Sequence, residues 1–173
     1  YSPYIRTAPY HYGWDWAPRL ISMGLFAPPV VERKNRIHPE DFYVRSKIEW
    51  SGTDATSATL TVCSSRRARG ASLTLVDPDG VELERAVMTG DSVSFAIPEP
   101  RLWMPNGWGK VERYTLVYQD ATGERDSLRV GLREVHLDQA NGAFRFVVNR
   151  RPFYAKGANY LPHDRRMGDH GRS

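Results

Sequence analysis

Hydrophobic and polar residues alternate in short runs through residues 42–132. In the first run, residues 42–50, the apolar side chains fall on every second position or a multiple of it: Phe42, Val44, Ile48 and Trp50. A period of two places these side chains on one face of a β-strand and the intervening polar residues on the other. The run therefore predicts a strand with one buried face.

Six further runs of this kind follow, at 60–62, 73–75, 81–88, 93–97, 114–119 and 128–132. The sequence Asp77-Pro78-Asp79-Gly80 lies between two of them and predicts a hairpin turn, because Pro fixes φ and Gly tolerates a positive φ. No convincing helical period interrupts the runs. Seven short strands in about 90 residues predict an immunoglobulin-like antiparallel β-sandwich, and the lack of a Cys pair argues against an antibody-type domain.

The flanking regions have different patterns. Residues 1–38 are rich in prolines and aromatic residues, and we interpret them as the end of a preceding domain. After the sandwich at 39–133, Asn141-Gly142 signals a hairpin, and a further strand is expected to begin at 152–157. We leave the polar tail, 164–173, unstructured. The start of the chain has no signal-peptide pattern and suggests a cut within a longer protein.

Composition narrows the function classes. The 173 residues carry a net charge of +4 with a pI near 9.3, and basic residues cluster at 66–69 and 165–166. No nucleic-acid-reading motif accompanies them, and no apolar run reaches the roughly 18 residues of a membrane span. We therefore expect no nucleic-acid partner and no membrane contact. Cys63 is the single cysteine and favours neither secretion nor a reducing compartment. The five histidines lack metal-ligand spacing, so no metal or other cofactor is expected.

The densest group of candidate functional residues is Tyr10-His11-Tyr12-Gly13-Trp14-Asp15-Trp16-Ala17-Pro18-Arg19. Aromatic faces stack on sugar rings, and carboxylates accept hydrogen bonds from sugar hydroxyls, so Trp14 beside Asp15 suits a saccharide site. The structural alternative is that Trp14 and Trp16 point together into a core, while Asp15 caps a turn or pairs with Arg19.

Four segments resemble β-mannosidases of glycoside hydrolase family 2. Residues 10–20 with Met23-Gly24 resemble the end of the family's N-terminal sugar-binding domain, and 102–109 and 130–133 resemble its sandwich domain. Residues 146–153 running into 156–162 resemble the entry into its barrel. The segments occur in the family's order and cover nearly the whole chain. One departure is Arg151, where the family often has a Gly in the turn before Pro152.

The resemblance implies an all-β chain: an immunoglobulin-like antiparallel β-sandwich with flanking fragments of a jelly-roll domain (1–38) and of a (β/α)8 barrel (134–173). It implies substrate-binding roles for Trp14 and Asp15, on a loop that reaches toward the terminal sugar. Asn159 would follow the first barrel strand, where it either contacts the sugar or anchors the adjoining loop. The aromatic residues Trp103 and Trp108 are expected to fix a loop and a domain contact.

The implied function is a retaining glycoside hydrolase that removes terminal β-mannose residues. Its expected partners are β-mannoside sugars and the rest of the parent chain. Two alternatives stay open: another family 2 exo-glycosidase, acting on β-glucosaminides or β-galactosides, and a free-standing sandwich module that binds carbohydrate or protein without catalysis.

Retaining glycosidases need two carboxyl groups, and in the resembled family these are two Glu residues late in the barrel, one of them after an Asn. The present sequence contains no Asn-Glu pair. We predict that the 173-residue chain alone does not hydrolyse an aryl β-mannoside, measured by release of the chromophore. Robust turnover by the isolated chain would contradict this assignment.

Overall fold

The structure is a computed structural model that describes residues 9–15, 18, 19, 21, 28, 29, 31, 37, 39–64 and 68–159. Backbone contacts divide the chain into two units. One is Lys34–Ala155, and the other combines Tyr1–Arg33 with Lys156–Ser173. Within the described residues, no helix is both long and apolar enough to cross a membrane. The predicted unstructured tail, 164–173, lies outside the described residues.

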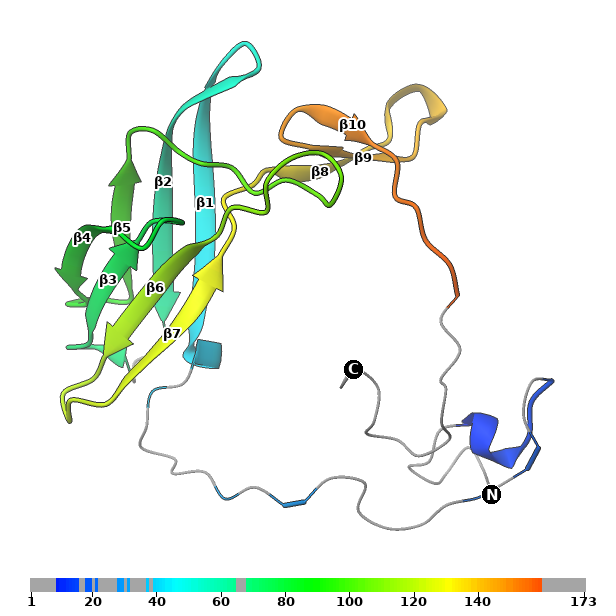
Figure 1. The fold of residues 1–173 in the computed structure, drawn as a ribbon, viewed down its shortest axis with the longest axis horizontal. Helices are drawn as coiled ribbons and strands as arrows, with labels where there is room; N and C mark the ends of the chain where they lie inside the picture. The colour runs from blue at the N-terminus through cyan, green and yellow to red at the C-terminus, as the bar shows by residue number, and fades with distance from the viewer. Residues whose placement is uncertain are drawn as a thin grey trace. The chain divides into compact units, whose positions relative to one another are not determined.

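Unit Lys34–Ala155 contains a sandwich of two antiparallel sheets (Figure 1). The first sheet has the order β1–β2–β5, formed by β1 (Phe42–Ser51), β2 (Asp54–Ser64) and β5 (Ser92–Ile97). The second has the order β4–β3–β6–β7, formed by β4 (Glu82–Val87), β3 (Ser72–Val76), β6 (Tyr114–Gln119) and β7 (Arg125–Val130). The prediction of an all-β antiparallel sandwich is confirmed.

The last sandwich strand was predicted at 128–132 but runs over Arg125–Val130. Its first half is polar, so the apolar pattern begins only at Leu128. Gly131 follows the strand, and a Cβ at this position would lie 2.8 Å from the Cβ of Trp103. The lack of a side chain at Gly131 therefore allows Trp103 to pack there.

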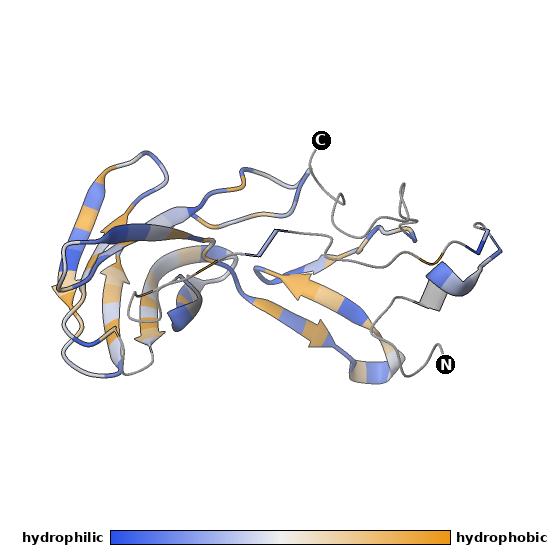
Figure 2. Cartoon of the chain, turned by 90° about the horizontal axis from the view of Figure 1, so that it is seen from below, coloured by the Kyte–Doolittle hydropathy of each residue, from blue (hydrophilic) through white to orange (hydrophobic). Residues whose placement is uncertain are grey.

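The sandwich core follows the predicted alternation, which Figure 2 shows as apolar and polar bands along the strands. The largest fully buried core side chains come from both sheets: Leu60, Val62, Leu73, Leu75, Phe95, Tyr114, Leu116 and Tyr118. In the first strand, Phe42 is buried and its ring centroid lies 4.7 Å from that of Tyr118 in the opposite sheet. Burial of each large side chain contributes about 1.5–3 kcal/mol, so this core is the main source of stability.

The predicted turn at Asp77-Pro78-Asp79-Gly80 is present between β3 and β4. Gly80 has φ +89°, which a residue with a side chain rarely adopts. The Asp77 carboxylate accepts hydrogen bonds from the backbone N–H groups of Asp79 (2.9 Å) and Val81 (2.8 Å). These bonds fix the turn before β4 begins.

A second, smaller sheet follows the sandwich in the same unit. It has the order β10–β9–β8, formed by β8 (Val135–Asp138), β9 (Arg145–Val148) and β10 (Arg151–Phe153). The expected hairpin at Asn141-Gly142 is confirmed as the short 3-10 turn η5 (Ala140–Gly142), in which both of these residues have positive φ. We call the three strands the meander.

The expected strand at 152–157 is shorter than predicted. Strand β10 ends at Phe153, and residues 154–159 form no strand within the described part of the chain. The turn before Pro152 consists of Asn149 (φ 48°) and Arg150 (φ 65°), since Arg151 already pairs with Val148. A two-residue hairpin turn with positive φ at both positions matches the twist of its strands.

Asn149 joins the meander to the sandwich. The residue is only 3% exposed. Its side-chain Oδ1 accepts a hydrogen bond from the Glu134 N–H (3.0 Å), and its Nδ2 donates one to the Trp103 carbonyl (2.9 Å). Its own backbone N–H donates to the Glu134 carbonyl (2.9 Å). One side chain thus satisfies backbone groups of two loops that are far apart in the sequence.

Three further contacts support this junction from β1 and the residue after it. The indole N–H of Trp50 donates to the Glu134 carboxylate (3.0 Å). The Arg150 guanidinium lies 5.1 Å from the centre of the Trp50 ring and donates to the carbonyl of Gly52 (3.0 Å). Arg150, the turn residue for which a positive φ is less favourable, is therefore held by contacts to the sandwich.

Replacing Asn149 with Ala tests the junction, and Asn141→Ala is a matched control because Asn141 also has positive φ (52°) but lies in an exposed turn. Both variants lose the tolerance of Asn for this conformation, whereas only Asn149→Ala removes the partner of two partly buried backbone groups, the Glu134 N–H and the Trp103 carbonyl. We expect Asn149→Ala to lower the free energy of unfolding by about 2–3 kcal/mol more than the control. Urea unfolding followed by circular dichroism measures the difference, and equal losses would contradict the role of Asn149.

Candidate functional site

The predicted sugar-binding pair, Trp14 and Asp15, lies in a loop directly after the 3-10 turn η2 (Pro9–Tyr12). Gly13 separates the two elements with φ +117°, a conformation that favours glycine. Trp14 is 61% exposed and Asp15 is exposed. The loop therefore presents an aromatic face and a carboxylate on consecutive residues.

The base of this loop is held by the residues on either side. The Arg19 guanidinium carbon lies 5.9 Å from the centre of the Tyr12 ring, within the range of a cation–π contact. No ion pair joins Asp15 to Arg19, both of which the structure describes. The structure therefore does not contain the Asp15–Arg19 ion pair of the structural alternative, and the Arg19 side chain is directed to Tyr12.

The structural alternative also placed Trp14 and Trp16 together in a core. The exposure of Trp14 does not fit a core position, while Trp16 lies outside the described residues. An exposed indole costs free energy in water, since most of its surface is apolar. The loop has the properties of a recognition surface: a flat apolar wall with an adjacent hydrogen-bond acceptor.

Asn159 is the last described residue of the chain. It is exposed and belongs to no strand, so the structure does not place it at the end of one. No hydrogen bond joins it to Trp14 or Asp15 among the described residues. Its place at the mouth of a barrel stays a prediction.

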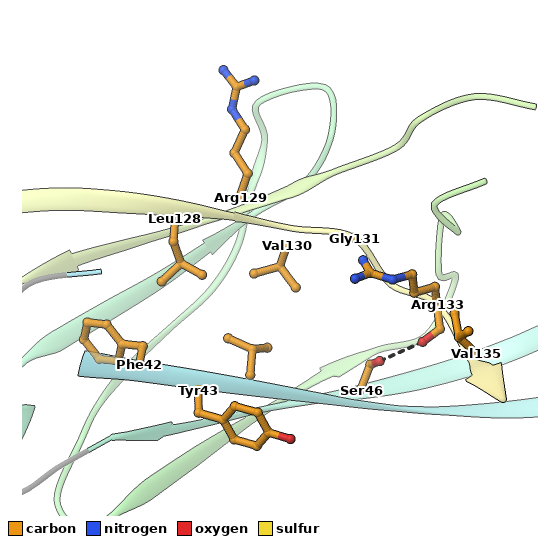
Figure 3. Close-up of a pocket in the computed structure, with 10 residues that line it drawn as sticks. Phe42, Tyr43, Ser46, Leu128, Arg129, Val130, Gly131, Arg133 and Val135 are labelled. Atoms are coloured by element: carbon orange, nitrogen blue, oxygen red, sulfur yellow. Dashed lines mark hydrogen bonds between the residues drawn. The ribbon is translucent and has the colours of Figure 1, made fainter. Parts of the chain in front are cut away.

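A shallow groove of about 390 Å³ lies between β1 and β7, which are the edge strands of the two sandwich sheets. Figure 3 shows Leu128 and Val130 pointing into it from β7, whereas Arg129 points away. The Ser46 hydroxyl donates to the Arg133 carbonyl (3.2 Å) at one end. The ten lining residues include no carboxylate, so this groove cannot supply the acid pair of a glycosidase.

The part of the chain that the structure describes has few other groups that could bind a metal or react. No three His, Cys, Asp or Glu side chains come together there as a metal site. Cys63 is a half-buried free thiol. The carboxylate of Asp138 accepts a hydrogen bond from the Ala140 N–H and pairs with Arg145 (2.9 Å), and both contacts hold the pKa of Asp138 below its ordinary value. This pair closes the β8–β9 hairpin and has no substrate-binding geometry.

The predicted structural role of the segment 102–109 agrees with the structure. Trp103 forms an isolated bridge with Val111 and covers Gly131, and Trp108 packs edge-on against Phe153 of β10 with ring centroids 5.2 Å apart. The residue missed by the sequence analysis is Asn149, which connects this segment to the meander. The sequence analysis expected the turn at Arg151, and the distant partners of Asn149 leave no local pattern in the sequence.

Curated relatives match nearly the whole chain. β-Mannosidase B of Thermothelomyces thermophilus is 32% identical over 176 residues, which cover 92% of this chain and 20% of that protein. β-Mannosidase A of Neosartorya fischeri is 26% identical over 204 residues, which cover 93% of this chain and 22% of that protein. The chain thus spans about a fifth of the length of these relatives.

Solved structures support the fold. A β-glucuronidase of Dictyoglomus thermophilum matches with a TM-score of 0.54 at 21% identity, over 68% of this chain and 18% of that chain. A β-glucuronidase of Ruminococcus gnavus in complex with D-glucaro 1,5-lactone matches with a TM-score of 0.51 at 21% identity, over 68% and 19% of the two chains. No family model matches the sequence. The β-mannosidase relatives confirm the resemblance drawn from the four sequence segments, and the solved structures support the fold alone.

The exposure of Trp14 can be tested by fluorescence quenching with iodide, which reaches exposed indoles only. We expect Trp14→Phe to lower the quenchable fraction of the emission, because Trp14 is 61% exposed. The control Trp50→Phe removes a half-buried indole and should raise that fraction. A quenchable fraction that does not change in Trp14→Phe would contradict the loop conformation described above.

Proposed function

We propose that this chain, a segment of the β-mannosidase type of glycoside hydrolase family 2, belongs to a retaining enzyme that removes terminal β-mannose residues. The segment supplies the linker sandwich and one wall of the sugar site. Both catalytic carboxyl groups lie in other parts of the enzyme, so the segment contributes contacts to the sugar site without completing it and does not cleave the substrate.

The observation that carries this proposal is the exposed Trp14–Asp15 pair, within a chain that aligns over 92% of its length with a protein named β-mannosidase B. The exposed indole offers a flat apolar face on which a sugar ring can stack, and the carboxylate beside it can accept hydrogen bonds. Gly13 and the Tyr12–Arg19 contact hold the loop in the conformation that exposes both residues. The pair is therefore organised before substrate arrives, which lowers the entropy cost of binding.

In this proposal the Asp15 carboxylate accepts hydrogen bonds from two sugar hydroxyls. Trp14 provides the apolar wall against the C–H face of the ring. Hydrogen bonds to a charged group contribute about 1.5–3 kcal/mol each, and they are directional. Asp15 therefore contributes most to the choice of sugar, and Trp14 contributes affinity. Asn159 is the third proposed contact, with a side-chain amide that can both donate and accept.

Asp15 has a binding role and not a catalytic one. A retaining mechanism needs two carboxyl groups about 5–5.5 Å apart on opposite sides of the scissile bond. The residue next to Asp15 is Trp14, which has no carboxyl group and so cannot form such a pair with Asp15. The proposed division places recognition of the terminal sugar partly in this segment and bond cleavage outside it.

Substitutions at this pair in the longer protein that contains the chain test the proposal. We expect Asp15→Asn to lower kcat/KM for an aryl β-mannoside by about 10–100-fold, from the loss of charged hydrogen bonds. Trp14→Ala should lower it by about 10-fold through the loss of stacking. The control Asp91→Asn removes another exposed carboxylate, which pairs with Arg69 (2.8 Å) in the sandwich, and should leave kcat/KM unchanged.

Unchanged kcat/KM in both Asp15→Asn and Trp14→Ala would contradict the proposed wall of the sugar site. A matching loss in Asp91→Asn would show that the effect is one of general stability. Binding of mannose by the 173-residue chain alone, measured by calorimetry, separates a divided site from a complete one. We expect no saturable binding.

A further inference from the structure

Arg19 flanks the Trp14–Asp15 loop, and its side chain crosses the base of that loop. The guanidinium carbon lies 5.9 Å from the centre of the Tyr12 ring. A Cβ added at Gly13 would lie 3.9 Å from the Cβ of Arg19, so the Arg19 side chain starts beside the Gly13 backbone. The contact with Tyr12 therefore joins the residue before the loop to the residue after it.

Asp15 is also within reach of the Arg19 side chain. Asp15 follows Gly13 by two residues, and two residues span at most about 7 Å of backbone. A long arginine side chain that starts beside Gly13 can therefore turn toward the Tyr12 ring or toward the Asp15 carboxylate. Arg19 and Asp15 are both exposed, so packing in a core does not fix the direction of the guanidinium.

The two partners of Arg19 compete on nearly equal terms. A cation over an exposed aromatic ring and an ion pair at the surface stabilise by similar, small amounts. The Tyr12 ring is half-buried, so less side-chain freedom is lost when a cation settles on it than when two exposed side chains pair. In the structure the guanidinium lies with Tyr12, and no ion pair joins it to Asp15, although both residues are described.

The choice of partner matters for the proposed sugar contact. An arginine that pairs with a carboxylate takes a lone pair from one or both of its oxygens. An Asp15 carboxylate in that state would offer fewer acceptors to sugar hydroxyls, and the sugar would have to displace the guanidinium, which lowers affinity. A guanidinium held on Tyr12 leaves both oxygens of Asp15 open.

We propose that Tyr12 is a positioning residue of the sugar site: it holds the Arg19 guanidinium away from Asp15 and so keeps that carboxylate open to the sugar hydroxyls. Tyr12 does not touch the sugar in this arrangement and acts through Arg19 alone. The inference rests on the proposed role of Asp15 in sugar binding and adds the pair of residues that controls access to its carboxylate.

A double-mutant cycle in the longer protein tests whether Tyr12 acts through Arg19. We expect Tyr12→Leu to lower kcat/KM for an aryl β-mannoside by about 3–5-fold, the effect of one exposed ion pair near its upper strength. In an Arg19→Gln background, Tyr12→Leu should have no further effect, because no cation remains to occupy Asp15. Tyr12→Phe keeps the ring face and should leave kcat/KM unchanged. An equal loss from Tyr12→Leu with and without Arg19→Gln would overturn the proposal.

A salt series separates this role from a general loss of structure. Relative to the unchanged protein at the same salt, the loss in Tyr12→Leu should shrink to less than about 2-fold near 1 M salt, since an exposed ion pair is screened there. The matched control is Tyr43→Leu, because Tyr43 is also exposed and has an arginine, Arg45, 5.2 Å from its ring centre, but lies in β1. It should leave kcat/KM unchanged. A loss in Tyr12→Leu that is the same at low and high salt would overturn the proposal.

Cross-linking locates the cation at position 19 without any measurement of turnover. Arg19→Lys is made in the longer protein with and without Tyr12→Leu, and a water-soluble carbodiimide joins a carboxylate to an amine that touches it. Mass spectrometry of the loop peptide measures the bond between Asp15 and the introduced amine as the loss of one water. We expect its yield to rise by about 3-fold or more when Tyr12→Leu is added, because the population of the paired state increases. Equal yields would overturn the proposal.

Failure of the positioning role is distinguishable from failure of the sugar contact. If Asp15→Asn leaves kcat/KM unchanged, the proposed sugar contact is wrong, and the cross-link yield still reports whether Tyr12 holds the cation away from Asp15. If Asp15→Asn lowers kcat/KM and the yield does not respond to Tyr12→Leu, the sugar contact stands and the role of Tyr12 is overturned.

Discussion

The hydrogen bonds of one buried side chain, Asn149, attach the meander to the sandwich. Asn149 accepts from Glu134 and donates to Trp103, and it sits in the two-residue turn between β9 and β10. Without these bonds the meander would be a short three-stranded sheet attached by one connection, which is marginal in water. With them, the meander has a second attachment to the sandwich. The adjacent Arg150 adds a contact to Trp50 and Gly52 on the first hairpin of the sandwich.

The sandwich itself is a frame with little chemistry. Its core is apolar, and the groove between its edge strands has no carboxylate among its lining residues. The feature that suits recognition of a ligand is the exposed Trp14–Asp15 loop, which precedes the sandwich in the sequence. This distribution fits a linker domain, which holds other elements at fixed positions and depends on packing and hydrogen bonds more than on reactive groups.

The sequence predicted the sandwich because apolar residues recur at every second position, or a multiple of it, in most of its strands, and this spacing places them on one face of a sheet. The start of β7 was missed because Arg125 and Asp126 hide the apolar pattern. The predicted continuation of the strand past Phe153 was wrong, since the described chain offers no partner strand there. Asn149 was missed for a different reason. Its partners lie 15 and 46 residues away, and hydrogen bonds of that separation leave no local pattern.

The candidate site could be located from the sequence, but the sequence could not decide between packing in a core and exposure in a loop. Trp14 and Trp16 at a spacing of two fit both a core strand and an exposed loop, and the exposure of Trp14 was known only from the structure.

The choice of sugar is the central claim, and a substrate panel tests it most directly. The kcat/KM of the longer protein is measured on aryl β-mannoside, β-glucosaminide, β-galactoside and β-glucuronide. The account predicts a preference for the β-mannoside of at least about 100-fold, the selectivity of a site that bonds hydroxyls specifically. Equal or higher kcat/KM on any of the other three would contradict it.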